Sequence, residues 1–186
     1  MADVSTEHLK SVMKYDAVSG VFTYTENRGR QRKAGDVAGC ISPKSYHHGG
    51  GYRIIAIRDG AFRKEYGAHR LAWFYVYGVW PKGQLDHING KRDDNRIANL
   101  REATRSQNGA NRAANSNNTS GLKGVSLHKA TGKWRSDIYV EGKALFLGYH
   151  ESLASAGAAY DLAAYMHFGE FARVSSGLHQ IGDQHG

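Results

Sequence analysis

The sequence of 186 residues predicts an α+β fold made of two small domains joined by a short tether. Strand-like runs separated by glycine turns occur in both halves of the chain, and runs of helical length accompany them. Between the halves, residues 113–120 hold only small and polar side chains, which is typical of a linker. We therefore expect domains at residues 1–112 and 121–175 and a flexible tail at 176–186.

The first domain is predicted to combine a hairpin, a longer strand and a buried helix. Ser5 can cap a short N-terminal helix, and Gly20–Tyr24 forms the centre of a hairpin-like segment. Residues 47–58 predict a glycine turn followed by a strand whose successive side chains face opposite sides. The apolar run Ala68–Tyr77, which ends before Gly78, predicts a buried helix.

The second domain is predicted to be three strands followed by one helix. Glycine-containing pairs and triplets separate the strand-like runs, and such residues favour hairpin turns. The expected strands are residues 122–128, 133–140 and 143–149. Ser152 can cap a helix that reaches about His167.

The charge distribution points to a polyanionic partner. The formal net charge is +8, and residues 91–135 hold 10 Lys or Arg against 3 Asp or Glu. Clustered basic side chains displace counterions from phosphates, so nucleic acid is the expected partner. A second basic run, Arg28 to Lys33, is either a solvated loop or an arm that contacts phosphate.

Cysteine content and hydropathy exclude several classes of protein. Cys40 is the one cysteine, so neither an intrachain disulfide nor a paired-cysteine zinc knuckle is possible. No apolar run approaches the ~18 residues that span a membrane, and the N-terminus does not resemble a signal peptide. We expect a cytoplasmic protein without a membrane partner.

Residues 85–108 carry the most chemical information. They predict a strand that ends in Asp86-His87, a polar loop closed by Asn99, a second short strand, and a helix that begins near Thr104. This order would let Asp86 and Asn108 approach one point in space. Phosphodiester hydrolysis needs a base for the water, and an imidazole suits that task at neutral pH. Hard oxygen donors such as a carboxylate and an amide suit Mg²⁺ or Mn²⁺.

The run DHINGKRDDNRIANLREATRSQN, residues 86–108, resembles the homing-endonuclease branch of the HNH nuclease family. The resemblance covers about residues 65–112 and implies a ββα-metal core there. It implies that His87 is the general base, that Asp86 and Asn108 bind one divalent metal ion, and that Asn99 braces the loop. Asn108 stands where other branches have histidine, which favours Mg²⁺ or Mn²⁺ over zinc.

Three further residues of this region have open roles. His69 matches a His-Arg-Leu feature of the family, but a histidine that starts an apolar helix can also be a packing residue. Asn95 and Arg96 could contact phosphate or only hold the turn.

The C-terminal segment, residues 120–172, resembles the plant ethylene-response-factor (APETALA-type) DNA-binding domain. The resemblance rests on ordered blocks such as Gly132-Lys133-Trp134-Arg135 and Ala158-Ala159-Tyr160-Asp161. It implies a three-stranded sheet that reads the major groove while one helix braces its back. The residues expected to contact DNA are Lys123, Ser126, His128, Lys133, Trp134, Arg135, Asp137, Tyr139, Lys143 and Phe146. Trp134 and Phe146 could equally pack on the sheet, and Ser126 and Ala144 replace arginines of the plant proteins.

Together these features predict a site-selective DNA endonuclease that nicks double-stranded DNA as a monomer. The phage-type resemblance implies the cytoplasm of an infected bacterium. An alternative is a DNA-binding regulator that uses the HNH region as a scaffold without cutting. An RNA-binding protein is a weaker alternative, because stacking platforms of the RNA-recognition kind are lacking.

Overall fold

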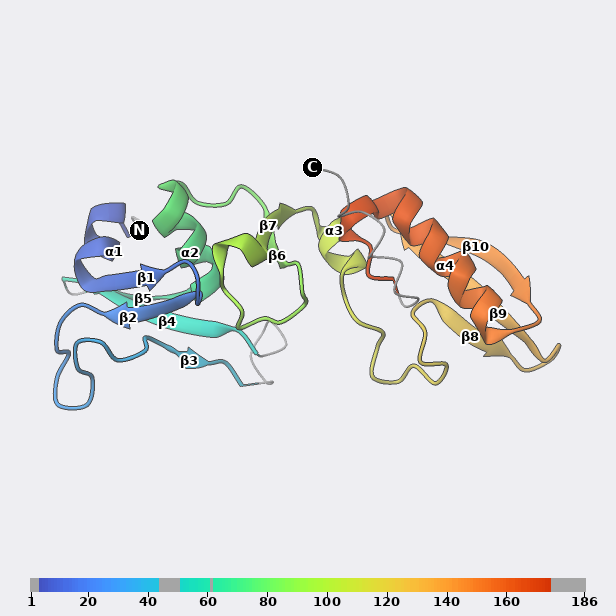
Figure 1. Ribbon diagram of the computed structural model, residues 1–186, viewed down its shortest axis with the longest axis horizontal. Helices are drawn as coiled ribbons and strands as arrows, with labels where there is room; N and C mark the ends of the chain where they lie inside the picture. Colours follow the sequence, from blue (N-terminus) through green and yellow to red (C-terminus); the bar gives the residue numbers. More distant parts are fainter. Residues whose placement is uncertain (1–3, 44–50, 61, 175–186) are drawn as a thin grey trace. The chain divides into compact units, whose positions relative to one another are not determined.

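The computed structural model describes residues 4–43, 51–60 and 62–174 (Figure 1). It is a mixed α/β structure with small antiparallel sheets, and it divides into one compact unit that ends at Glu102 and another that begins at Ala103. Residues 47–50 of the expected glycine turn and the expected tail at 176–186 lie outside the described residues. Among the helices that the structure describes, none is long and apolar enough to cross a membrane.

The first unit holds three small antiparallel sheets and two α-helices within its described residues. One sheet pairs β1 with β2, a second has the order β3-β4-β5, and a third pairs β6 with β7. The elements are α1 (Thr6–Val12), β1 (Met13–Asp16), β2 (Val21–Tyr24), β3 (Cys40–Ile41), β4 (Arg53–Asp59), β5 (Phe62–Gly67), α2 (Ala68–Tyr77), β6 (Gln84–His87), the 3-10 turn η1 (Ile97–Asn99) and β7 (Leu100–Ala103).

Local signals in the sequence explain the helices of this unit. Ser5 accepts a hydrogen bond from the backbone N–H of His8 and so caps α1, as predicted. Gly78 ends α2 with a left-handed backbone, φ 72°, which glycine adopts at low cost. Ile55 and Ile57 of β4 are buried, and α2 packs on β4 and β5. These contacts place the start of α2 beside the core.

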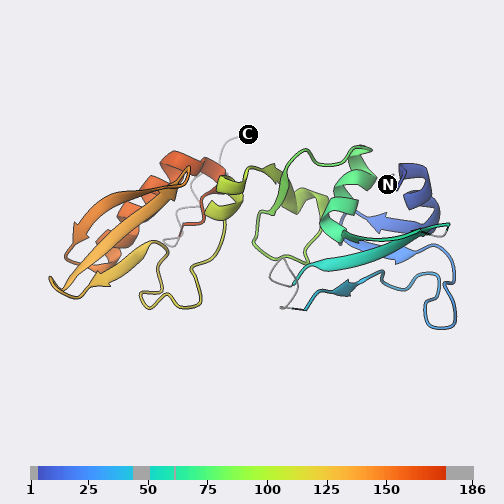
Figure 2. The ribbon, with the colours of Figure 1, turned by 180° about the vertical axis from the view of Figure 1, so that it is seen from behind.

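The second unit is a three-stranded antiparallel sheet backed by one long helix. The strand order is β10-β9-β8, and α4 lies across one face of the sheet (Figure 1). Figure 2, the view from behind, shows the strands in front of α4. The expected strands and helix are confirmed, with boundaries that differ by a few residues. The elements are α3 (Arg105–Ala110), β8 (Val125–His128), β9 (Lys133–Val140), β10 (Lys143–His150), α4 (Leu153–Phe168) and the 3-10 turn η2 (Gly169–Phe171).

A close approach at Gly124 explains why β8 begins later than the expected residue 122. Gly124 has φ 70°, and a β-carbon there would lie 2.2 Å from ring atoms of Tyr160 on α4. The chain therefore turns at residues 122–124, against the helix, before the ladder starts at Val125. The predicted linker, residues 113–120, lies within this second unit, and Ser120 Oγ donates to the carbonyl of Val125 at 2.7 Å.

Candidate active site

Four polar side chains are buried around the loop between β6 and β7. Asp86, His87, Asn95 and Asn99 are 3%, 5%, 1% and 7% exposed. Polar groups at such depth require hydrogen-bond partners, because an unsatisfied group costs about 1–3 kcal/mol. Residues 88–96 form neither helix nor strand, so side-chain contacts add to the few backbone hydrogen bonds that fix this loop.

The ring of His87 is oriented by Asn95. The His87 Nε2 atom lies 3.1 Å from Asn95 Oδ1, and Asn95 Nδ2 donates to the carbonyl of Asp93 at 3.3 Å. An amide oxygen can only accept, so Nε2 of His87 carries the proton in this bond. The basic lone pair of a neutral ring then lies on Nδ1.

Burial lowers the pKa of His87, because desolvation disfavours the imidazolium. The hydrogen bond with Asn95 and the neighbouring Asp86 carboxylate oppose this effect in part. A lowered pKa keeps the ring neutral at pH 7, which is the form that can accept a proton.

Asp86 is held by an arginine that the sequence did not single out. Nε and Nη2 of Arg101 lie 3.0 Å and 2.9 Å from Asp86 Oδ2, and both side chains are largely buried. Arg101 lies on β7, which pairs with the strand of Asp86. The long loop between the strands hides their register, so the spacing could not identify this pair.

Asn99 contacts the loop that it was expected to brace. Its Nδ2 donates to the Asp94 carbonyl at 2.8 Å and to Asn89 Oδ1 at 3.1 Å. Its Oδ1 accepts from the backbone N–H of Asn89 at 3.0 Å. One side chain therefore joins both ends of the segment that follows His87.

Two further rings lie beside His87. The ring centroid of His69, in the first turn of α2, is 5.4 Å from that of His87. Tyr52, just before β4, lies 5.2 Å from His69 and 5.9 Å from His87. The structure thus brings His69 to the same place as His87, and Tyr52 is a neighbour that the sequence did not identify.

The side chain of Arg96 forms an ion pair with another residue of the same loop. Its guanidinium contacts both carboxylate oxygens of Asp94, at 2.7 Å and 2.6 Å, and this bond holds the pKa of Asp94 at about 2. These contacts hold the turn, which was one of the two roles left open for Arg96.

Asn108 lies in α3 and belongs to the second unit. A capping box begins this helix: Thr104 Oγ1 accepts from the Gln107 N–H, and Gln107 Oε1 accepts from the Thr104 N–H. No three His, Cys, Asp or Glu side chains gather as a metal cluster in the part of the chain that the structure describes.

Lys123 and Trp134 contact other parts of the second unit. The Nζ atom of Lys123 lies 3.2 Å from the Gly109 carbonyl and 2.5 Å from the Ala110 carbonyl, at the end of α3. Burial lowers the pKa of Lys123 to about 8, so the ammonium still predominates at pH 7. Trp134 packs against the core of the second unit. Both residues are half-buried, and their expected contact with DNA stays a prediction.

The remaining predicted DNA contacts lie toward the open face or edges of the sheet. Strand alternation buries Ser136 and Ile138 and leaves Arg135 and Tyr139 exposed. Exposed Ser126 faces Arg135 across the β8–β9 ladder, and Lys143 starts β10. Several of these side chains contact neighbouring residues. Arg135 pairs with Asp137 and lies over the ring of Phe146. Lys133 forms an ion pair with Glu151, and His128 contacts Thr131 and Tyr149.

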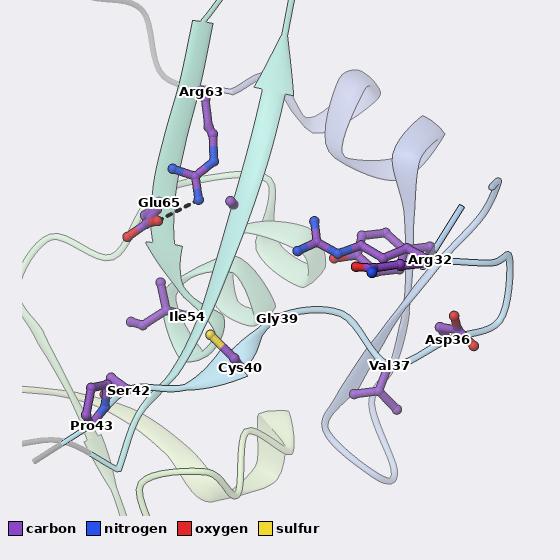
Figure 3. Close-up of a pocket in the computed structure, with 13 residues that line it drawn as sticks. Arg32, Asp36, Val37, Gly39, Cys40, Ser42, Pro43, Ile54, Arg63 and Glu65 are labelled. Atoms are coloured by element: carbon purple, nitrogen blue, oxygen red, sulfur yellow. Dashed lines mark hydrogen bonds and ion pairs between the residues drawn. The ribbon is translucent and has the colours of Figure 1, made fainter. Parts of the chain in front are cut away.

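A hollow lies over β3, β4 and β5, apart from the predicted catalytic residues. Arg32, Cys40, Arg63 and Glu65 are among its lining side chains, and Arg63 pairs with Glu65 (Figure 3). None of the predicted catalytic or metal-binding residues lines it. It is therefore not a candidate for the hydrolytic site.

Comparison with known proteins identifies the class. The HNH endonuclease family matches residues 66–110, which contain α2, β6, β7 and α3, and the chain belongs to this family. A relative is Protein 3.8 of Escherichia phage T7, which is 34% identical over 113 residues. The match covers 60% of this chain and 93% of that protein. No solved structure matches the chain. The predicted HNH resemblance is confirmed.

Replacing Lys123 with methionine tests whether the sheet domain supports the helix of Asn108. The variant should speed amide hydrogen exchange in α3 by about tenfold, because a charge-assisted hydrogen bond contributes about 1.5 kcal/mol or more. Lys133→Met is the matched control, since it also removes one lysine charge from the sheet domain. Equal exchange rates in the two variants would contradict the role of Lys123.

Proposed function

We propose that the protein is a site-selective DNA endonuclease that hydrolyses one phosphodiester bond with His87 as general base. The observation that carries this proposal is the buried Asp86-His87 pair, in which Asn95 fixes the proton of His87 on Nε2. Membership of the HNH endonuclease family supports DNA as the substrate.

In the proposed reaction, Nδ1 of His87 accepts the proton of the water that attacks phosphorus. Such proton transfer contributes about 10²–10⁴-fold to a rate. Asn95 keeps the second nitrogen protonated, so the ring does not present the wrong atom to the water. Burial of the ring supports the neutral form before the reaction.

The donor chemistry fits one divalent ion, Mg²⁺ or Mn²⁺. Asp86 offers a carboxylate and Asn108 an amide oxygen, and DNA phosphate and water would complete the shell. When bound, the ion supplies positive charge for the phosphate and the leaving oxygen. Arg101 holds Oδ2 of Asp86 and so fixes the carboxylate, while Asn99 holds the loop.

The open face of the β8–β10 sheet is proposed to read double-stranded DNA in the manner of an APETALA-type domain. Its outward side chains include Arg135 and Tyr139, with Phe146 exposed beside Arg135, and Lys143 is exposed at the start of β10, opposite Val140. A basic face with aromatic side chains suits contacts with phosphates and groove edges. Ser126, His128 and Lys133 belong to the same proposed surface.

A single Asp86-His87-Asn99-Asn108 set supports a nick by a monomer. One such set can be in line with one scissile phosphate at a time, and cutting both strands would need a symmetric dimer on a palindromic site. The phage T7 relative supports a phage protein that acts in the cytoplasm of an infected bacterium. A homing-type role is part of the same proposal.

Incubation with supercoiled plasmid and Mg²⁺ tests the proposed activity. Relaxed circles should accumulate before linear DNA, and a chelator should abolish cutting. His87→Ala should lower cleavage by about 10²–10⁴-fold and change DNA affinity by no more than about threefold, because the base acts in the transition state. His8→Ala, which alters a histidine of α1, is the control.

Cleavage at the same rate with and without a metal ion, or full activity of the His87→Ala variant, would overturn this assignment. DNA binding without cutting under all metal conditions would favour the non-cutting regulator instead.

The salt dependence of DNA binding tests the sheet surface. Lys143→Ala should reduce the slope of log K against log salt by about 1, because one phosphate contact is lost. Lys14→Ala removes an exposed lysine of β1 in the first unit and should leave the slope unchanged. If the two variants behave alike, the sheet is not the DNA-binding face.

A further inference from the structure

We infer that Tyr15 and Asn95 are positioning residues for His87, so that the N-terminal β1–β2 hairpin sets the orientation of the catalytic ring. The inference rests on the proposed function, since it assigns a supporting role around the same base. The hairpin is distant in sequence from the HNH segment at residues 66–110, and no sequence motif indicates a catalytic role for it.

The contact between hairpin and loop is buried and direct. The Tyr15 hydroxyl donates to the backbone carbonyl of Asn95 at 2.7 Å, and the Tyr15 ring packs on Phe22 of β2 and on Tyr75 of α2. Tyr15 is 8% exposed and Asn95 is 1% exposed. Burial raises the pKa of Tyr15 to about 12, so the hydroxyl stays protonated and remains a donor.

A second contact fixes the same backbone from the hairpin turn. Gly20 has φ 74°, and a β-carbon there would lie 2.3 Å from Arg96 N and 2.6 Å from Asn95 C. The turn thus meets the loop without space for a side chain. Since the loop has no regular structure of its own at this point, these outside contacts add to those of Asn99 and Arg96 in fixing its position.

The side chain of Asn95 connects this fixed backbone to the ring of His87. Its backbone is held by Tyr15 and approached by Gly20, its Nδ2 donates to the Asp93 carbonyl, and its Oδ1 accepts from His87 Nε2. A displacement of the loop would move the acceptor that defines the tautomer of His87. Partners that orient a metal-ligating histidine typically change activity by about 10–100-fold when they are removed, and we expect a loss of this size for the partner of His87.

The test combines nitrogen-15 NMR of the histidine rings with single-turnover cleavage in the full chain. In the wild type, His87, assigned by comparison with His87→Ala, should show the Nε2–H tautomer alone. Asn95→Leu keeps similar volume but removes the acceptor, so a mixed tautomer pattern should appear. Its kcat should fall by about 10–100-fold while KM for DNA stays within about threefold. Asn95→Asp keeps an acceptor and should restore the Nε2–H pattern.

Tyr15→Phe removes only the hydroxyl and should lower kcat by about threefold or more at unchanged KM. Tyr24→Phe is the matched control, because Tyr24 is a buried tyrosine of the same hairpin whose ring lies beside Arg28. An unchanged tautomer in Asn95→Leu, or equal effects of the two tyrosine variants, would overturn the inference. If the wild type cuts no DNA, the proposed function fails, whereas the tautomer result still decides the role of Asn95.

Discussion

The burial of polar side chains around the irregular loop between β6 and β7 is the constraint on which the first unit depends. A loop without regular structure cannot satisfy such groups from its own ladder, and each unsatisfied group would cost about 1–3 kcal/mol. Neighbouring elements therefore supply the partners: β7 provides Arg101 for Asp86, and β1 provides Tyr15 for the backbone of Asn95. The scaffold around the HNH segment thus determines where His87 points.

In the second unit, contacts between distant segments likewise connect the two proposed roles, which are DNA contact by the sheet and metal binding by Asn108. Lys123 precedes the sheet, yet its ammonium contacts the final carbonyls of the helix that carries Asn108. The same domain thus presents a basic sheet face and supports a proposed metal ligand. The helix α3 also packs on α4 and η2, and it belongs to the second unit.

The sequence predicted the elements whose signals are local. Ser5, Ser152 and the run Ala68–Tyr77 identified helices, because capping and apolar length act within a few residues. It could not predict contacts between distant segments, such as the 80-residue separation of Tyr15 and Asn95. The resemblance also did not indicate that Lys123 contacts the end of α3, because that contact joins two segments of the second unit.

The most direct test of the proposed active site is the position of Mn²⁺ in crystals of the His87→Ala variant bound to DNA. Anomalous scattering locates the ion independently of activity, and the substitution is expected to prevent cleavage. We expect one ion that contacts both the Asp86 carboxylate and the Asn108 amide oxygen, next to a phosphate. An ion bound elsewhere, or one that contacts neither residue, would contradict it.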